Sequence, residues 1–217
     1  MSHDLRTPLT SLHGFLETLA HKRDLSEAER ERYLKTALAQ SSKVARLAHE
    51  LFELARLEHD ASSLEQETFS LGDLVHDVAQ ELSLLAAAKR QRLTIDVSPD
   101  LANVVGSLRL IDRALTNLID NAIRHTPAGG EILVALHTVG KDVEVVVSDD
   151  GPGIPPKMRE ALSSPSPFPG PRATGGLGLQ IVQRILELHG SRLEFLNAER
   201  GTRLRFQLAT APFQSRQ

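Results

Sequence analysis

A histidine and an aspartate lie side by side at positions 3 and 4, followed by Arg6-Thr7-Pro8. A neutral imidazole is a nucleophile at one ring nitrogen, and a carboxylate beside it can hold the proton on the other nitrogen. The alternative is an ordinary solvated histidine near the start of a helix. Pro8 removes a backbone hydrogen bond and kinks a helix, which is unusual in a simple coiled coil. His3 and Asp4 are therefore candidates for nucleophilic chemistry.

A pair of asparagines, Asn117 and Asn121, forms the second candidate site. Residues four apart share one face of a helix, so both amides can project into one site while Leu118 and Ala122 cover the other side. An amide oxygen is a suitable ligand for Mg²⁺, which keeps most of its waters and binds mainly through phosphates. The alternative is a pair of surface amides on an amphipathic helix.

Two glycine-rich segments complete the set of candidates. Asp149-Asp150-Gly151-Pro152-Gly153 follows an apolar strand and lets the backbone approach a flat ligand closely, although the same pairs occur in plain turns. Gly175-Gly176-Leu177-Gly178 opens a helix, where free N–H groups and the helix dipole can hold phosphate, although flexible linkers look similar. The second segment lacks the P-loop pattern and no strand immediately precedes it, which disfavours P-loop and dinucleotide-binding folds.

The first element that must position these groups is a helical hairpin within residues 1–60. Ser26 to Glu29 is typical of a capping box, and the short connection at 22–25 predicts antiparallel neighbours. Apolar residues recur there at steps of three and four, in a stripe narrow enough for a bundle seam: Leu5, Leu9, Leu12, Leu16, Leu19, then Val44, Leu47, Leu51, Leu54 and Leu57. Two helices cannot bury such seams alone, so we expect a homodimer that forms a four-helix bundle.

The rest of the chain predicts a second domain. A polar linker at 61–70 precedes a helix at 71–90, with Leu74, Val78, Leu82 and Leu85 on one side. Two further helices are expected at 107–124 and 177–188, and strands at 92–98, 132–137, 143–147, 192–196 and 203–208. The fold class is therefore α+β: a helical hairpin followed by an α/β sandwich with a mixed, mostly antiparallel sheet and helices on one face.

Composition excludes several classes of function. The 217 residues carry 25 Lys plus Arg against 28 Asp plus Glu, a net charge of −3 that argues against a nucleic-acid partner. The absence of Cys excludes disulfides, thiolate catalysis and Cys-ligated zinc, and no two of the nine His are three or four apart. No apolar run approaches the ~20 residues of a bilayer crossing, so we expect this portion of the protein to be soluble and cytoplasmic.

The order and spacing of these motifs resemble the sensor histidine kinases of bacterial two-component systems, from residue 2 to about residue 208. His-Asp-x-Arg-Thr-Pro is similar to the H box, Asn-x3-Asn-Ala to the N box, and the two glycine-rich segments to the G1 and G2 boxes. Gly201-Thr202 is similar to the last glycine turn. The resemblance implies a dimerisation and phosphotransfer hairpin at 1–60, a linker at 61–70, an ATP-binding domain at 71–210 and a tail at 211–217.

The resemblance also implies roles for individual residues. His3 is the expected phospho-acceptor, Asp4 its acid/base partner, and Thr7 the residue that aligns water for dephosphorylating the partner. Asn121 is the expected Mg²⁺ ligand, with Asn117 one turn earlier. The remaining residues expected at the ATP site are Arg124, His125, Asp149 for the adenine amino group, Gly151, Gly153, Gly176, Leu177, Gly178 and Thr202.

The activity that the resemblance implies is autophosphorylation of His3 from ATP, followed by transfer to an aspartate of a response regulator. Relatives that hydrolyse ATP carry a glutamate where Asn117 lies, and an amide cannot activate water. Two features depart from the family pattern: prolines alternate through 163–171 around Phe168, and Thr174 replaces a common glycine. They leave an alternative open, a phosphatase-biased or docking module with an impaired nucleotide lid. Because His3 lies near the start of the sequence, we expect a longer, membrane-anchored receptor.

Overall fold

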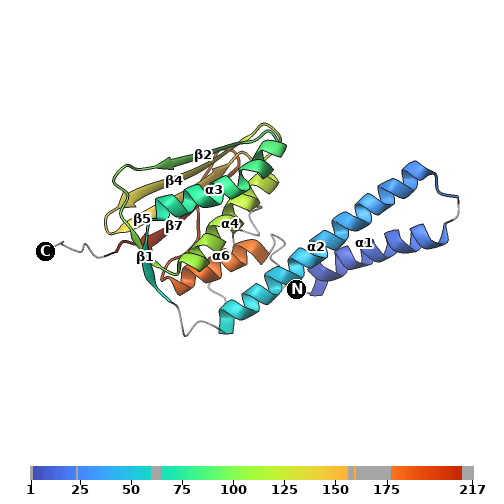
Figure 1. Cartoon of the computed structure of the whole chain (residues 1–217), viewed down its shortest axis with the longest axis horizontal. Helices are drawn as coiled ribbons and strands as arrows, with labels where there is room; N and C mark the ends of the chain where they lie inside the picture. Colours follow the sequence, from blue (N-terminus) through green and yellow to red (C-terminus); the bar gives the residue numbers. More distant parts are fainter. Residues whose placement is uncertain (1, 23, 60–64, 156–158, 160–176, 212–217) are drawn as a thin grey trace.

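The computed structural model describes residues 2–22, 24–59, 65–155, 159 and 177–211. It contains a helical hairpin followed by an α/β domain, which confirms the fold class predicted from the sequence (Figure 1). Among the helices within these ranges, none combines the length and the apolar character needed to cross a bilayer.

The hairpin consists of α1 (Ser2–His21) and α2 (Glu27–His59), and α1 packs against the first part of α2 (Figure 1). The predicted capping box is present, because the Ser26 amide donates to Glu29 Oε2 at 3.0 Å and the Glu29 amide donates to Ser26 Oγ at 3.3 Å. These bonds satisfy amide groups that the first turn of a helix leaves unpaired, and they lower the pKa of the Glu29 carboxyl.

The leucine seam of the hairpin is only partly covered within one chain. Leu9 and Leu16 of the seam remain 46% and 49% exposed, and Leu38 of α2, which was not among the predicted seam residues, remains 67% exposed. Leu47, by contrast, is buried. The hairpin therefore presents an apolar face whose burial by a second hairpin would stabilise it, although the four-helix bundle stays a prediction.

The five-stranded sheet of the second domain is mixed and mostly antiparallel, as predicted. Its order is β2 (Arg92–Val97), β4 (Glu131–Val139), β5 (Asp142–Asp149), β7 (Thr202–Ala209) and β6 (Glu194–Phe195). Only the β2–β4 pair is parallel among these neighbours. A small antiparallel sheet of β1 (Glu67–Phe69) and β3 (Val104–Gly106) was not predicted, and β1 lies within the stretch that we expected to be linker.

Three helices, α3 (Leu71–Ala88), α4 (Leu108–His125) and α6 (Leu177–Leu188), cover one face of this sheet (Figure 1). Alternate residues of β5, such as Val143 and Val145, are fully buried against them in an aliphatic core. The expectation that Leu85 of α3 belongs to this core is wrong, because its side chain is 52% exposed while Ala86 is buried. The buried stripe of α3 reaches Ala86 through Val75 and Val78, which turns Leu85 toward solvent.

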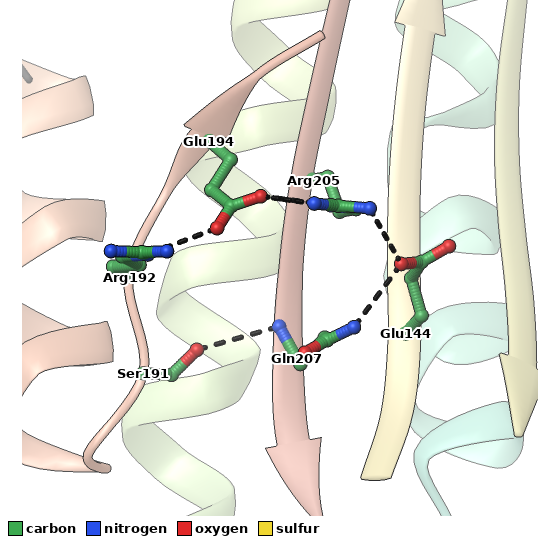
Figure 2. A network of polar contacts seen from close by, with 6 residues as sticks. All are labelled: Glu144, Ser191, Arg192, Glu194, Arg205 and Gln207. Carbon is green, nitrogen blue, oxygen red and sulfur yellow. Dashed lines mark hydrogen bonds and ion pairs between the residues drawn. The ribbon is translucent and has the colours of Figure 1, made fainter. Parts of the chain in front are cut away.

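The opposite face of the sheet is polar. Figure 2 shows Glu144 of β5, Arg205 and Gln207 of β7 and Glu194 of β6 joined across the strands. Arg205 forms ion pairs with both Glu194 and Glu144, and Gln207 Nε2 donates to Glu144 Oε2 at 3.2 Å. These contacts hold neighbouring strands together on the side of the sheet that faces solvent.

The hairpin and the α/β domain are in direct contact. The last part of α2 packs on α6, and Leu54 and Leu57 belong to the same buried cluster as the core of the α/β domain. Glu53 of α2 also forms an ion pair with Arg113 of α4. The contact therefore joins the hairpin to the two helices that carry the candidate asparagines and the second glycine-rich segment.

Candidate functional site

Helix α4 carries one polar stripe over an apolar face. Eight of its residues, from Leu110 to Ile123, are buried in the core, whereas Asn117 and Asn121 are half-buried and Arg124 is exposed. Arg124 forms an ion pair with Asp120 one turn earlier. The Nδ2 atom of Asn117 is buried and has no hydrogen-bond partner in the structure. An unpaired buried donor costs stability, so this amide is suited to an acceptor supplied by a ligand.

The start of α6 lies beside Asn117. A Cβ atom added at Gly178 would come within 3.8 Å of Asn117 Oδ1, so the first turn of α6 faces the polar stripe of α4. Leu177 is the first residue of α6, and both residues are half-buried. The structure therefore brings Gly178 and Asn117 together. Gly176, Phe168 and Thr174 lie outside the described residues.

A buried carboxylate ends strand β5. Asp149 is 9% exposed and accepts a hydrogen bond from the Gly151 amide at 2.7 Å. Burial raises the pKa of the Asp149 carboxyl, while the Gly151 amide, the hydroxyl and amide of Thr202 and nearby His125 act in the opposite direction. Asp149 is thus a positioned acceptor at the edge of the core, and Thr202 lies opposite it in the β5–β7 ladder.

The turns around Asp149 have no room for side chains. A Cβ at Gly201 would overlap the carbonyl oxygen of Asp149, and it would also require a non-glycine residue at φ +76°. A Cβ at Gly151 would lie 2.6 Å from Asp149 Oδ1 and 3.1 Å from the backbone oxygen of His125. Gly151 therefore brings the loop after β5 against the end of α4. Gly153, at φ +78°, packs in turn against the oxygen of Gly201.

The predicted nucleotide residues thus form two groups along α4. Asn117 lies with Gly178 at one level, and His125 lies with Asp149, Gly151 and Thr202 at the other end. Asn121 and Arg124 occupy the stripe between these levels. A cradle of this kind can hold a flat ring at Asp149 and an anionic group near the start of α6.

The phospho-acceptor motif lies on a different element. His3 and Asp4 are part of α1, but their side chains are outside the described part of the structure. The roles predicted for them therefore stay predictions. Thr7 is exposed and Pro8 lies inside the helix. Figure 1 shows that α1 starts at the end of the hairpin nearer to the α/β domain. The phospho-acceptor motif therefore lies on a different element from Asp149, which ends β5.

Comparison with known families identifies both parts of the chain. Residues 106–212 match the family of histidine kinase-, DNA gyrase B- and HSP90-like ATPases, and residues 1–60 match the His kinase A phospho-acceptor domain. This chain belongs to the sensor histidine kinases of bacterial two-component systems. The two matches follow each other in the order that the sequence motifs predict.

Individual relatives agree with this assignment. Drug sensory protein A of Synechocystis is 31% identical over 230 residues, which cover 99% of this chain and 34% of that protein. The chain therefore spans about a third of the length of this curated relative. The structure of full-length ShkA in complex with AMPPNP has a TM-score of 0.66 at 25% identity and covers 97% of this chain and 45% of that chain. Histidine kinase ThkA in complex with response regulator protein TrrA has a TM-score of 0.77 at 24% identity, with 97% and 60% covered.

The structure also shows residues beside the predicted site that sequence reasoning did not consider. Arg113 lies one helical turn before Asn117 on α4, and the spacing 113–117–121 could have indicated its place on the same stripe. Lys89 and Gln91 contact the end of α4 from the turn after α3. No local pattern reveals this contact, because the donors lie more than thirty residues before their acceptors.

Proposed function

We propose that this chain is the kinase core of a two-component sensor, which binds ATP in the cradle along α4 and transfers its terminal phosphoryl group to His3. The observation that carries this proposal is the buried, glycine-walled carboxylate of Asp149 placed at one end of the α4 stripe, with the unpaired amide of Asn117 near the other. The H-box residues of α1 supply the acceptor for the same reaction.

The residues of the cradle fit an adenine nucleotide. Asp149 offers an acceptor oxygen to the exocyclic amino group, and Gly151 and Gly153 let the loop after β5 pack tightly around that carboxylate. Asn117 Nδ2, buried without a partner in the structure, has an acceptor available once phosphate oxygens lie between α4 and the start of α6. Gly176, Leu177 and Gly178 then belong to the phosphate end of the site, and Thr202 supports Asp149 at the ring end.

The same arrangement accommodates Mg²⁺ through Asn121. Magnesium keeps several waters and is bound through one or two protein oxygens plus substrate phosphates. We assign Asn121 as the protein ligand, because its amide oxygen is a suitable donor and it lies half-buried one turn after Asn117 on the polar stripe of α4. Bound Mg²⁺ neutralises phosphate charge, and Arg124 and His125 add positive or donor groups on the same side of α4.

The chemistry asked of the protein is mostly positioning. One imidazole nitrogen of His3 attacks the γ-phosphorus, the bond from that phosphorus to the bridging oxygen breaks, and the electrons of that bond stay with ADP. Asp4 holds the proton on the other ring nitrogen. Asn117 cannot take a proton from water, so hydrolysis is disfavoured against transfer. Thr7 is assigned to the reverse task of aligning water on the phosphorylated partner.

Further proposals concern the whole protein. We divide the chain at 1–60, 61–70, 71–210 and 211–217 into hairpin, hinge, ATP-binding domain and tail. A second copy of the chain covers the exposed leucine seam, and a response regulator receives the phosphoryl group from His3. The match of residues 1–60 to the phospho-acceptor domain supports both partners. The core works on the cytoplasmic side of a longer membrane-anchored receptor.

The test is phosphoryl labelling of the full chain with γ-labelled ATP and Mg²⁺. We expect an acid-labile, base-stable label that disappears in His3→Gln and persists in His13→Gln, a matched change at an exposed histidine of α1. Nucleotide binding without any label, or a label that survives in His3→Gln, contradicts the proposal. The first of these outcomes favours the docking or phosphatase-biased alternative.

A further inference from the structure

The carbonyl groups at the end of α4 are satisfied from a distant segment. The last four carbonyls of a helix have no partner within the helix, and the residue after α4 is Thr126, not a glycine cap. Gln91 Nε2 donates to the oxygens of Ile123 at 2.9 Å and Thr126 at 2.6 Å. Lys89 Nζ donates to the oxygens of Ile123 at 2.8 Å and Arg124 at 3.1 Å. We call Lys89 and Gln91 the α4 clamp.

The turn that carries the α4 clamp is held in an uncommon conformation. The Gln91 amide donates to the Ala86 oxygen at 3.0 Å and the Arg90 amide donates to the Ala87 oxygen at 2.8 Å, which is the Schellman motif at the end of α3. This motif places the residue after the C-cap in the left-handed region, and here that residue is Arg90, at φ 57°, where glycine is usual. The two clamp side chains flank this residue and both reach α4.

The end of α4 is also a wall of the candidate nucleotide site. The backbone oxygen of His125 lies 3.1 Å from where a Cβ of Gly151 would be, so the loop that carries Asp149 and Gly151 rests on this turn. Arg124 and His125 leave the helix from the same turn. Lys89 of the clamp binds the Arg124 carbonyl, and Gly151 lies against the neighbouring His125 carbonyl.

We propose that Gln91 is a positioning residue for nucleotide binding and that it acts through the backbone of 123–126. This inference rests on the proposed function. Gln91 is 8% exposed, and its Nε2 donates both to Ile123 in the last turn of α4 and to Thr126 directly after the helix. Its Oε1 atom is buried without a hydrogen-bond partner in the structure. An aliphatic side chain would avoid that unpaired oxygen but would leave the Thr126 carbonyl without its donor. The Gln91 side chain therefore orders the turn that the nucleotide would contact. It does so at the cost of a buried, unpaired Oε1 atom, which an apolar core residue would not have.

The first measurement uses the full chain without nucleotide. In Gln91→Leu, we expect the amides of 122–126 to exchange hydrogen about tenfold faster, the equivalent of one lost hydrogen bond. The matched control is Leu208→Val, a buried change in β7 at the strand end away from Thr202. In the control, we expect the exchange rates of the amides of 122–126, relative to those of the rest of the domain, to equal the wild-type values. Equal exchange in both variants overturns the proposal.

The second measurement is calorimetric titration with ATP and Mg²⁺. We expect Gln91→Leu to weaken binding about tenfold while Leu208→Val, at similar loss of thermal stability, binds as the wild type. Lys89→Met, a change at an exposed side chain that cannot disturb the core, is expected to weaken binding about threefold. Wild-type affinity in both clamp variants overturns the inference alone, whereas absence of binding to the wild type overturns the proposed function with it.

Discussion

Gly201 offers the sharpest test of how the Asp149 site is built. In Gly201→Ala, the new Cβ would overlap the Asp149 carbonyl oxygen and lie 2.7 Å from its carbon, at a position with φ +76°. The matched control is Gly140→Ala, which has φ +64° but no atom within 4 Å of the added Cβ. Both variants force alanine into the left-handed region, and only the first collides with backbone. The difference between them therefore isolates the collision at Asp149.

The expected magnitudes follow from these two terms. The left-handed conformation of alanine destabilises either variant by about 1 kcal/mol net. This value allows for the lower conformational entropy of the unfolded chain once a glycine is replaced. Overpacking against backbone adds about 1–3 kcal/mol in Gly201→Ala. At about 2–4 °C per kcal/mol, we expect melting temperatures lower by about 2–4 °C in Gly140→Ala and about 4–16 °C in Gly201→Ala. Scanning calorimetry measures both, and equal shifts in the two variants would refute the tight packing of Gly201 on Asp149.

Three further outcomes follow from individual contacts. Arg90→Gly should stabilise the domain by about 0.5–1 kcal/mol in urea unfolding, because it removes the strain at φ 57°; a loss of stability would contradict this. A double-mutant cycle of Glu53→Gln and Arg113→Gln should give a coupling of about 1 kcal/mol, since these side chains are 27% and 32% exposed; zero coupling would show that the ion pair does not join the domains. Burial lowers the pKa of His189, whose Nε2 accepts from the Ser107 amide at 2.9 Å. Neutral His189 therefore stabilises the fold fully above about pH 6.5, and this contribution declines as the pH falls below that value. In His189→Gln, the free energy of unfolding should depend less on pH below about 6.5, and an unchanged pH dependence would assign the effect to other groups.

Sequence reasoning reached most of the fold because the determining signals are local. The helix expected at 177–188 has these bounds in the structure, and the alternation of Leu93, Ile95 and Val97 indicated β2. The capping box at Ser26 marked the start of α2 to the residue. In each case the chemistry of neighbouring side chains fixes the local backbone.

The features that escaped prediction depend on contacts between distant segments. The strands β1 and β3 have three residues each, too few to show alternation, and they exist because they pair with one another. The α4 clamp joins Gln91 to Thr126, and the left-handed Arg90 occupies a position where the expected residue is glycine. For the site, motifs indicated which residues to consider. The close packing of Gly201 against the Asp149 carbonyl, which leaves no room for a Cβ atom, is visible only in the three-dimensional structure.

Binding of an adenine nucleotide to Asp149 is the claim on which the proposed function depends most. Isothermal titration of the full chain with ADP and ATP, in the presence of Mg²⁺, measures it directly for the wild type and Asp149→Asn. The substitution replaces one acceptor oxygen by a donor amide, so we expect affinity for both nucleotides to fall about 30-fold while the fold is kept. No heat from the intact wild type at millimolar nucleotide, or equal affinity in Asp149→Asn, would contradict it.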